Sequence, residues 1–322
     1  MKRPRFLPDN FTLALLGTVC LASVLPVRGS AAEGFDWLTI AAIALLFFLH
    51  GAKLSRAAVV AGMSHWRLHL LVFACTFVLF PIFGLLLKPV FSVVLTPDLA
   101  VGMLFLCTLP ATVQSSIAFT AMARGNVAAA VCSASASSLL GVFITPLLVG
   151  WLVVSGGVSG TGNLETVGRI MLQLMLPFVL GQLLQPWIGE FVRRHATGLK
   201  LVDQGSILLV VYTAFSAAVI EGLWKQVPLP MLLSLAVSCC LLLALSLSTT
   251  TWASRAFGFS KEDEVAIVFC GSKKSLASGV PMAKVLFAAH TVGVMLLPIM
   301  LFHQIQLMVC AVLAQRYAKR GT

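Results

Sequence analysis

Long apolar stretches alternate with short polar loops from one end of this chain to the other. A helix needs roughly 20 mainly apolar residues to cross a bilayer, because every backbone N–H and C=O must find its partner inside the segment. The pattern predicts ten such segments, at 11–27, 36–52, 68–92, 98–123, 126–154, 165–190, 201–221, 229–254, 264–287 and 290–315. We therefore expect an all-α, polytopic membrane protein with ten transmembrane helices and no soluble domain.

The composition agrees with this pattern. Hydrophobic residues make up 59% of the chain and charged residues 10%, and the mean hydropathy is +1.00. A soluble domain is roughly half apolar and a quarter charged. The net charge of +11 comes from thin basic strips between apolar segments, without a basic domain that carries aromatic platforms. We therefore expect a lipid bilayer, and no nucleic acid, as the surroundings of this chain.

The basic residues also predict the topology. Of the 22 Lys and Arg residues, fifteen fall on one side of the predicted membrane and five on the other. Because cytoplasmic loops carry the excess of Lys and Arg, both termini are expected in the cytoplasm, with the chain in the plasma membrane, or the inner membrane of a bacterium. The remaining two basic residues, Lys273 and Lys274, fall inside the ninth predicted helix.

The first residues offer an alternative reading. MKRPRFLPDN, an apolar run and RGSAAEG also fit a cleaved signal peptide. Cleavage would leave nine helices and remove the symmetry of the two halves, so we expect a first transmembrane helix here.

A glycine-rich linker at 154–166, VSGGVSGTGNLET, lies near the middle of the chain. It separates a first half, 1–160 with helices 1–5, from a second half, 161–322 with helices 6–10. Because five is an odd number, the second half enters from the opposite side, as in the inverted repeats of secondary transporters.

The fourth helix of each half is interrupted by polar and helix-breaking residues. The fourth predicted helix contains LPATVQSSIAF, and the ninth contains CGSKKSLASGVP. A break at the membrane midplane exposes the carbonyl end of one half-helix and the amide end of the next, each with roughly half an elementary charge. The candidate site residues are Thr112, Gln114, Ser115, Ser116, Ser272, Lys273, Lys274 and Ser275.

A charged lysine at the bilayer centre costs roughly 2.5–3.5 kcal/mol, so the position of Lys273 and Lys274 inside a predicted helix requires an explanation. Snorkelling or structural pairing is one explanation, although all Asp and Glu residues fall in loops or at helix ends. The lysines could instead bind an anionic substrate, replace a coupling cation or carry the coupling proton. Adjacent side chains on a helix point about 100° apart, and of the two we favour Lys273.

Four motifs resemble the bile acid:sodium symporter superfamily, in the subgroup similar to member seven of solute carrier family ten. They are HGAKLS at 50–55, ATVQSSIAFTAMARGNVAAAV at 111–131, GVFITPLL at 141–148 and GSKKSLASGVPMAK at 271–284. The resemblance spans essentially the whole chain. It implies interleaved panel and core subdomains, with helices 4 and 9 broken and crossing at an ion site.

The resemblance also implies site residues. Thr112, Ser115 and Ser116 match the polar stretch of helix four, where Ser115 and Ser116 could hold sodium, and Ser133 or Ser135 match hydroxyls of helix five. Helix nine departs from the pattern, because Phe269 stands where sodium-binding members have an acidic residue and Lys273-Lys274 stand where they have Gln-Asn. Both changes should repel sodium, and no other cofactor is expected.

These observations favour a secondary active transporter that carries an organic anion in symport with sodium or protons by alternating access. A cation/proton antiporter of the same architecture and a non-transporting membrane regulator are the alternatives. Substrate anions should protect the site in the first case, whereas pH alone should govern it in an antiporter. We expect no enzyme, since the sequence has no G-x-S-x-G or H-E-x-x-H motif.

Overall fold

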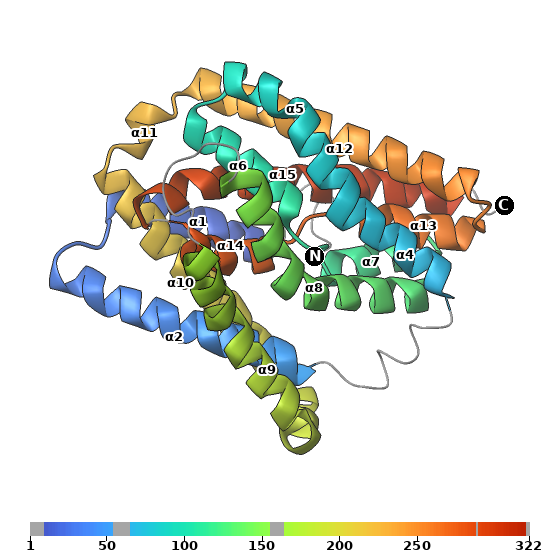
Figure 1. The fold of residues 1–322 in the computed structure, drawn as a ribbon, viewed down its shortest axis with the longest axis horizontal. Helices are drawn as coiled ribbons and strands as arrows, with labels where there is room; N and C mark the ends of the chain where they lie inside the picture. The colour runs from blue at the N-terminus through green and yellow to red at the C-terminus, as the bar shows by residue number, and fades with distance from the viewer. Residues whose placement is uncertain (1–9, 54–64, 155–163, 288, 320–322) are drawn as a thin grey trace, which may run out of the picture.

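The computed structural model of this protein describes residues 10–53, 65–154, 164–287 and 289–319. All regular structure in these ranges is helical, which confirms the all-α prediction (Figure 1). Most of the predicted linker at 154–166 lies outside them. In chain order the elements are α1 (Asn10–Val24), α2 (Ser30–Lys53), α4 (Trp66–Ala74), η2 (Cys75–Leu79), α5 (Phe80–Val94), α6 (Pro97–Thr108), α7 (Gln114–Met122), α8 (Val127–Val149), η3 (Gly150–Val154), α9 (Leu164–Arg194), α10 (Ala196–Ile220), α11 (Leu223–Gln226), α12 (Leu229–Ala256), α13 (Lys261–Gly271), α14 (Leu276–Leu286) and α15 (Ala289–Ala318).

Six helical segments among the described residues are long and apolar enough to cross a membrane, as expected for a multi-pass membrane protein. They are Ser30–Ala52, Trp66–Val94, Val127–Leu152, Ala196–Ile220, Leu229–Ala256 and Thr291–Ala318. Two shorter apolar helices, Leu13–Val24 and Pro97–Thr108, accompany them. The count of ten transmembrane helices stays a prediction.

Two interruptions of the chain separate short helices from each other. Between α6 and α7, Leu109 adopts an extended conformation with ψ 152°, which is what a residue before proline favours. Pro110 has no N–H, so the helix cannot continue through it. Between α13 and α14, Ser275 is extended and accepts a hydrogen bond from the Ser278 N–H at 3.1 Å, which caps α14.

Three of the four short helices, α6, α13 and α14, lie in the interior, whereas α7 buries only Ser116 and Thr120. Every residue of α6 from Leu99 to Thr108 is buried, and α6 contacts α5, α8 and α15. Longer helices enclose it (Figure 1). The interruptions are therefore held by tertiary contacts on all sides.

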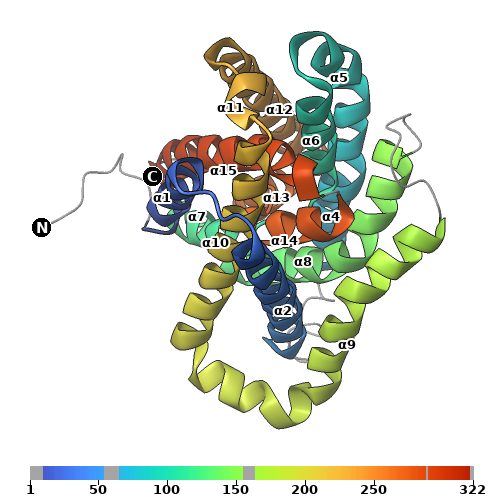
Figure 2. The ribbon, with the colours of Figure 1, turned by 90° about the vertical axis from the view of Figure 1, so that its left-hand side faces the viewer.

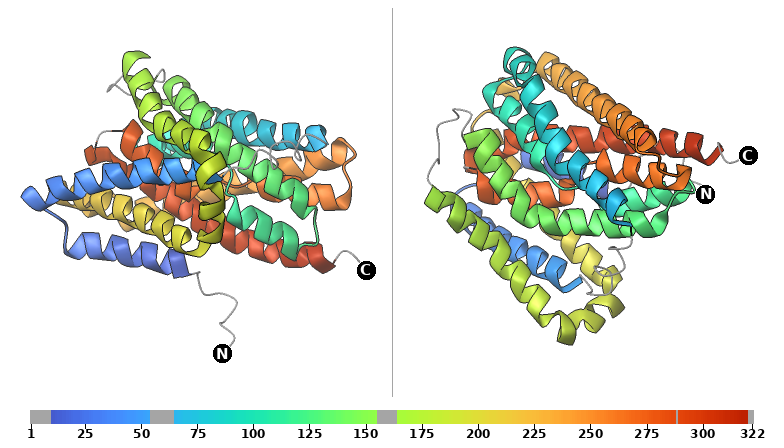
Figure 3. Two further views of the ribbon diagram at one scale, coloured as in Figure 1. Left: turned by 90° about the horizontal axis from the view of Figure 1, so that it is seen from below. Right: turned by 45° about the vertical axis from the view of Figure 1, so that its right-hand side comes forward.

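Helices α1, α2, α9 and α10 form a second group of contacts. The helix α2 packs along α9 and also touches α10, which in turn packs against α1. Figure 2 shows α2 between the arms formed by α9 and α10. At the other end of the molecule, both views of Figure 3 place the turn between α12 and α13 on the same side as the C-terminus.

Candidate functional site

The two chain interruptions meet. The Ser275 N–H donates to the Pro110 carbonyl oxygen at 2.9 Å, and the Ser116 hydroxyl donates to the Phe269 carbonyl oxygen at 2.8 Å. The first bond joins the two unwound segments, and the second joins the helices α7 and α13 beside them. Residues that the sequence separates by about half its length form one polar centre within an apolar molecule.

Lys274 sits in a cage of backbone oxygens and is only 1% exposed. Its Nζ donates to the carbonyl oxygens of Leu109 at 2.7 Å, Thr76 at 2.8 Å and Cys107 at 3.0 Å. The ring centroid of Phe80 lies 4.1 Å from the same nitrogen. The three donors of an ammonium group are therefore used, and an aromatic face adds a cation–π contact.

A local change of helix type makes one of these oxygens available. The segment Cys75–Leu79 is a π-helical turn within the continuous helix from α4 to α5. The Phe80 N–H bonds to the Cys75 carbonyl rather than to that of Thr76, its α-helical partner. The Thr76 carbonyl is thus released to accept from Lys274.

Lys274 also completes the C-terminal end of α6. The last four carbonyls of a helix lack an intrahelical partner and carry partial negative charge. Here every carbonyl oxygen from Phe105 to Pro110 accepts a hydrogen bond. The donors are as follows: Thr108 Oγ1 to Phe105 (2.7 Å), the Leu109 N–H to Leu106 (3.3 Å), Lys274 Nζ to Cys107 (3.0 Å), Thr145 Oγ1 to Thr108 (2.9 Å), Lys274 Nζ to Leu109 (2.7 Å) and the Ser275 N–H to Pro110 (2.9 Å).

Gln306 of α15 pairs with the backbone of Lys274 and is missing from the sequence-based site. Its Oε1 accepts from the Lys274 N–H at 3.0 Å and its Nε2 donates to the Lys274 carbonyl at 2.9 Å. The side chain is fully buried. Gln306 is one of three glutamines, with Gln304 and Gln315, in the mostly apolar segment 290–315, so the sequence alone does not single it out.

Lys273 has different surroundings, although it is also fully buried. Its Nζ donates to the Ser115 carbonyl at 3.0 Å and lies 4.0 Å from the ring centroid of Phe119 and 5.2 Å from that of Phe269. Among the residues that the structure describes, the Ser115 oxygen is its one hydrogen-bond acceptor. Phe269 thus provides an aromatic face to this ammonium.

The predicted hydroxyls of the first interruption and of α7 gather next to Lys273. Thr112 Oγ1 lies 2.8 Å from Ser115 Oγ and 3.2 Å from Ser116 Oγ. Gln114 is exposed and is not part of this cluster. The cluster contains the positions proposed for sodium, with an ammonium group bonded to the backbone of one of them.

The remaining predicted residues support the helices or lie apart. Ser272 Oγ donates to the Val268 carbonyl at 2.5 Å, and Ser275 caps α14. On α8, Ser133 Oγ lies 2.6 Å from His69 Nδ1, and Ser135 is half-buried. The structure does not bring these two α8 hydroxyls into the contacts of the two lysines.

Among the residues that the structure describes, the two lysines of the site have no carboxylate beside them. Within the described part of the chain, no Asp or Glu forms an ion pair with either lysine. Backbone dipoles and aromatic rings stabilise these ammonium groups, but they supply no full negative charge. Such a site favours an anion beside Lys273 and disfavours a further cation.

Comparison with known proteins agrees with the motifs and the helical fold. The sequence model of the SBF-like CPA transporter family matches residues 9–319. The Pseudomonas aeruginosa protein PA2026 is 68% identical over 99% of this chain and 96% of its own length. The Escherichia coli protein named "Putative symporter YfeH" is 59% identical over 97% of this chain and 93% of its own length.

A more distant relative is the sodium/bile acid cotransporter 7 of Rattus norvegicus, which is 27% identical over 92% of this chain and 88% of its own length. Its name agrees with the superfamily that the four motifs indicate. The match of the family model over nearly the whole chain decides the assignment: this chain belongs to the SBF-like CPA transporter family, whose members are membrane transporters of the bile acid:sodium symporter kind.

Proposed function

We propose that this chain is a secondary active transporter that carries a small organic anion by alternating access, with Lys273 as the group that meets the anion. The observation that carries the proposal is the pair of buried ammonium groups where the two interruptions meet, unmatched by any carboxylate of the described chain. A substrate anion would supply the missing negative charge. A buried charge is costly without a partner, so binding the anion is favourable there.

We further propose that protons, rather than sodium, couple the transport. The Lys274 ammonium fills a cage of three backbone oxygens, and Lys273 donates to the backbone of Ser115, one of the positions expected for sodium. Lys273 has one oxygen acceptor among the described residues, so its proton is less firmly held by neighbours. Loss of that proton in one half of the cycle would release the anion and couple its movement to the pH gradient.

The proposed architecture has ten transmembrane helices in two inverted five-helix repeats, in the inner membrane with both termini in the cytoplasm. Support comes from a matching feature of the two interruptions. The Ala111 N–H donates to Ser137 of α8 at 3.0 Å, and the Lys274 N–H donates to Gln306 of α15 at 3.0 Å. In each half, the helix that follows the interruption satisfies its unwound backbone. The contact group of α1, α2, α9 and α10 would form the panel.

Uptake of organic anions into proteoliposomes, with sodium and pH gradients imposed separately, tests the function. We expect uptake driven by the pH gradient and unchanged by sodium. The variant Lys273→Arg keeps the positive charge but does not release its proton. It should bind the anion and lose acceleration by the pH gradient. Lys225→Arg is the matched control at an exposed position of the short helix α11 and should behave like the wild type.

The outcomes separate the alternatives. Proton movement driven by a cation gradient, without anion uptake, would contradict the proposal and indicate a cation/proton antiporter. Absence of any flux, together with normal folding, would indicate a membrane regulator. Uptake that needs a sodium gradient would overturn proton coupling while leaving anion transport in place.

A further inference from the structure

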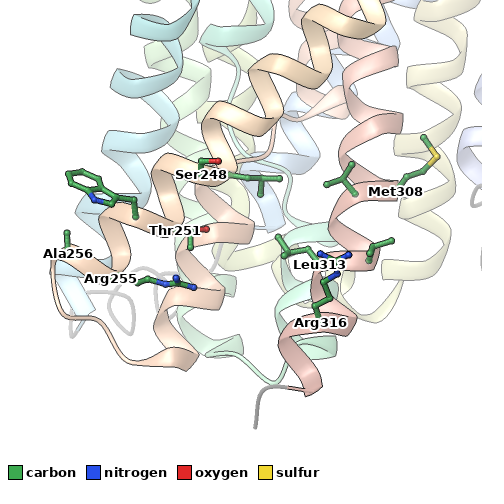
Figure 4. Close-up of a pocket in the computed structure, with 11 residues that line it drawn as sticks. Ser248, Thr251, Arg255, Ala256, Met308, Leu313 and Arg316 are labelled. Atoms are coloured by element: carbon green, nitrogen blue, oxygen red, sulfur yellow. The ribbon is translucent and has the colours of Figure 1, made fainter.

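A groove between the C-terminal halves of α12 and α15 has no role in the site described above. Figure 4 shows it open between the two helices, and its volume is about 1110 Å³. Pockets for small molecules measure roughly 300–1,000 Å³. Its apolar lining comes from Leu247, Trp252, Met308, Val309, Val312 and Leu313.

The apolar walls of the groove face outward, toward the surroundings of the helices. Trp252 is 69% exposed, Met308 53% and Val312 48%. Both helices are among the segments able to cross a membrane. Side chains exposed on such helices contact lipid, so hydrocarbon chains of the bilayer are the natural occupants of these walls.

One end of the groove is basic. Arg255 lies in the last turn of α12 and Arg316 in the last turn of α15, at the ends of the two apolar segments. Figure 4 shows both arginines at the same end of the groove, with Ser248 and Met308 farther along it. The exposed Trp252 has the amphipathic character typical of the membrane interface. Arginines at the ends of apolar helices, beside such a tryptophan, are typical of the level at which lipid headgroups lie.

The two arginines differ in their charge balance. Arg255 Nε and Nη2 donate to the Glu264 carboxylate at 3.0 and 2.9 Å, and Tyr317 donates to the same carboxylate at 2.8 Å. Arg316 is exposed and forms no ion pair with any carboxylate that the structure describes. The charges of Arg255 and Glu264 cancel, and Tyr317 is neutral. Arg316 therefore gives this end of the groove one net positive charge.

We propose that this groove binds one anionic phospholipid, with its acyl chain along α12 and α15 and its phosphate on Arg316. One net negative headgroup charge matches the one net positive charge of the site. A guanidinium forms two parallel hydrogen bonds with phosphate oxygens. Arg255 remains with Glu264 and presents its outer face to the headgroup.

Native mass spectrometry and thermal unfolding of the full chain with added lipid test this proposal. Phosphatidylglycerol should remain bound through purification and raise the unfolding temperature more than phosphatidylcholine does. Arg316→Gln should weaken phosphatidylglycerol binding about fivefold, the effect of about 1 kcal/mol for one basic residue at an anionic membrane surface. Arg28→Gln removes an exposed arginine from the loop between α1 and α2 and should leave the lipid preference unchanged.

A second variant tests the apolar walls. Val312→Trp narrows the groove and keeps both arginines, so it should reduce the bound phosphatidylglycerol as well. Equal binding of the two lipids by the wild type, or full retention of phosphatidylglycerol by both Arg316→Gln and Val312→Trp, would overturn the proposal. These readouts do not depend on transport, so they stand apart from the proposed function.

Discussion

At the scale of single residues, two neighbouring lysines have different partners. Three carbonyl oxygens surround the Lys274 ammonium, whereas one carbonyl and two aromatic rings surround that of Lys273. The first arrangement holds two chain interruptions together. The second leaves donor capacity for a solute. We therefore assign a structural role to Lys274 and a substrate role to Lys273.

Replacing Lys274 with Met should destabilise the protein more than replacing Lys273 with Met. The first change removes the donor from three carbonyls at the buried cage, and each unpaired buried group costs roughly 1–3 kcal/mol. The second removes the donor from one carbonyl. Thermal unfolding in detergent measures the difference. A larger loss of stability for Lys273→Met would contradict the assignment.

An emptied cage should accept a metal cation. Lys274→Ala leaves space among three carbonyl oxygens, the hard ligands that alkali cations prefer, whereas Lys274→Met fills that space with an apolar chain. Sodium chloride should therefore raise the unfolding temperature of Lys274→Ala relative to choline chloride at equal ionic strength. Neither Lys274→Met nor the wild type should respond. A sodium effect of equal size in all three proteins would refute the idea that the ammonium occupies a cation position.

At the scale of helices, close packing of α2 against α9 depends on two glycines. A methyl group added at Gly181 would overlap the Phe48 carbonyl oxygen, and one added at Gly51 would overlap that of Phe178. Small residues at helix contacts in membranes allow backbones to approach in this way.

Gly181→Ala should therefore push α2 and α9 apart and lower the unfolding temperature. Overpacking of this kind typically costs about 1–3 kcal/mol. Gly205→Ala is a matched control, since the position is also helical and a methyl group there meets no atom within 4 Å. Equal stability of the two variants would show that α2 and α9 can separate without cost.

The interrupted helices show which features of a helix the sequence can predict. Pro110 and the polar run around Lys273 predict where α6 and α13 stop, because proline and glycine act on the local backbone. The π-helical turn at Cys75–Leu79 is followed by Pro81, whose missing N–H favours a distortion of the helix there but does not specify a π-helical turn. Its geometry depends on what packs against it, so it could not be predicted from the chain alone.

For the whole molecule, the distribution of Lys and Arg predicts the orientation in the membrane. Cysteines substituted for Arg28 and Lys225 should react with an impermeant reagent added to intact cells. Cysteines substituted for Lys200 and Lys261 should react only after permeabilisation. Cys20 and Cys240, which are exposed, would first be replaced by serine. Labelling of the Lys200 and Lys261 positions in intact cells, and of the Arg28 and Lys225 positions only after permeabilisation, would show that the chain has the opposite orientation.

The sequence by itself determined the apolar segments, the places where two of them break, the family and the burial of two charges in an apolar chain. Hydropathy and backbone restrictions are properties of neighbouring residues, so they can be deduced from the order of the letters. Only the tertiary structure decided which groups hold each charge. The cage of Lys274 uses carbonyls 165, 167 and 198 residues away, and any residue type offers the same carbonyl to a partner.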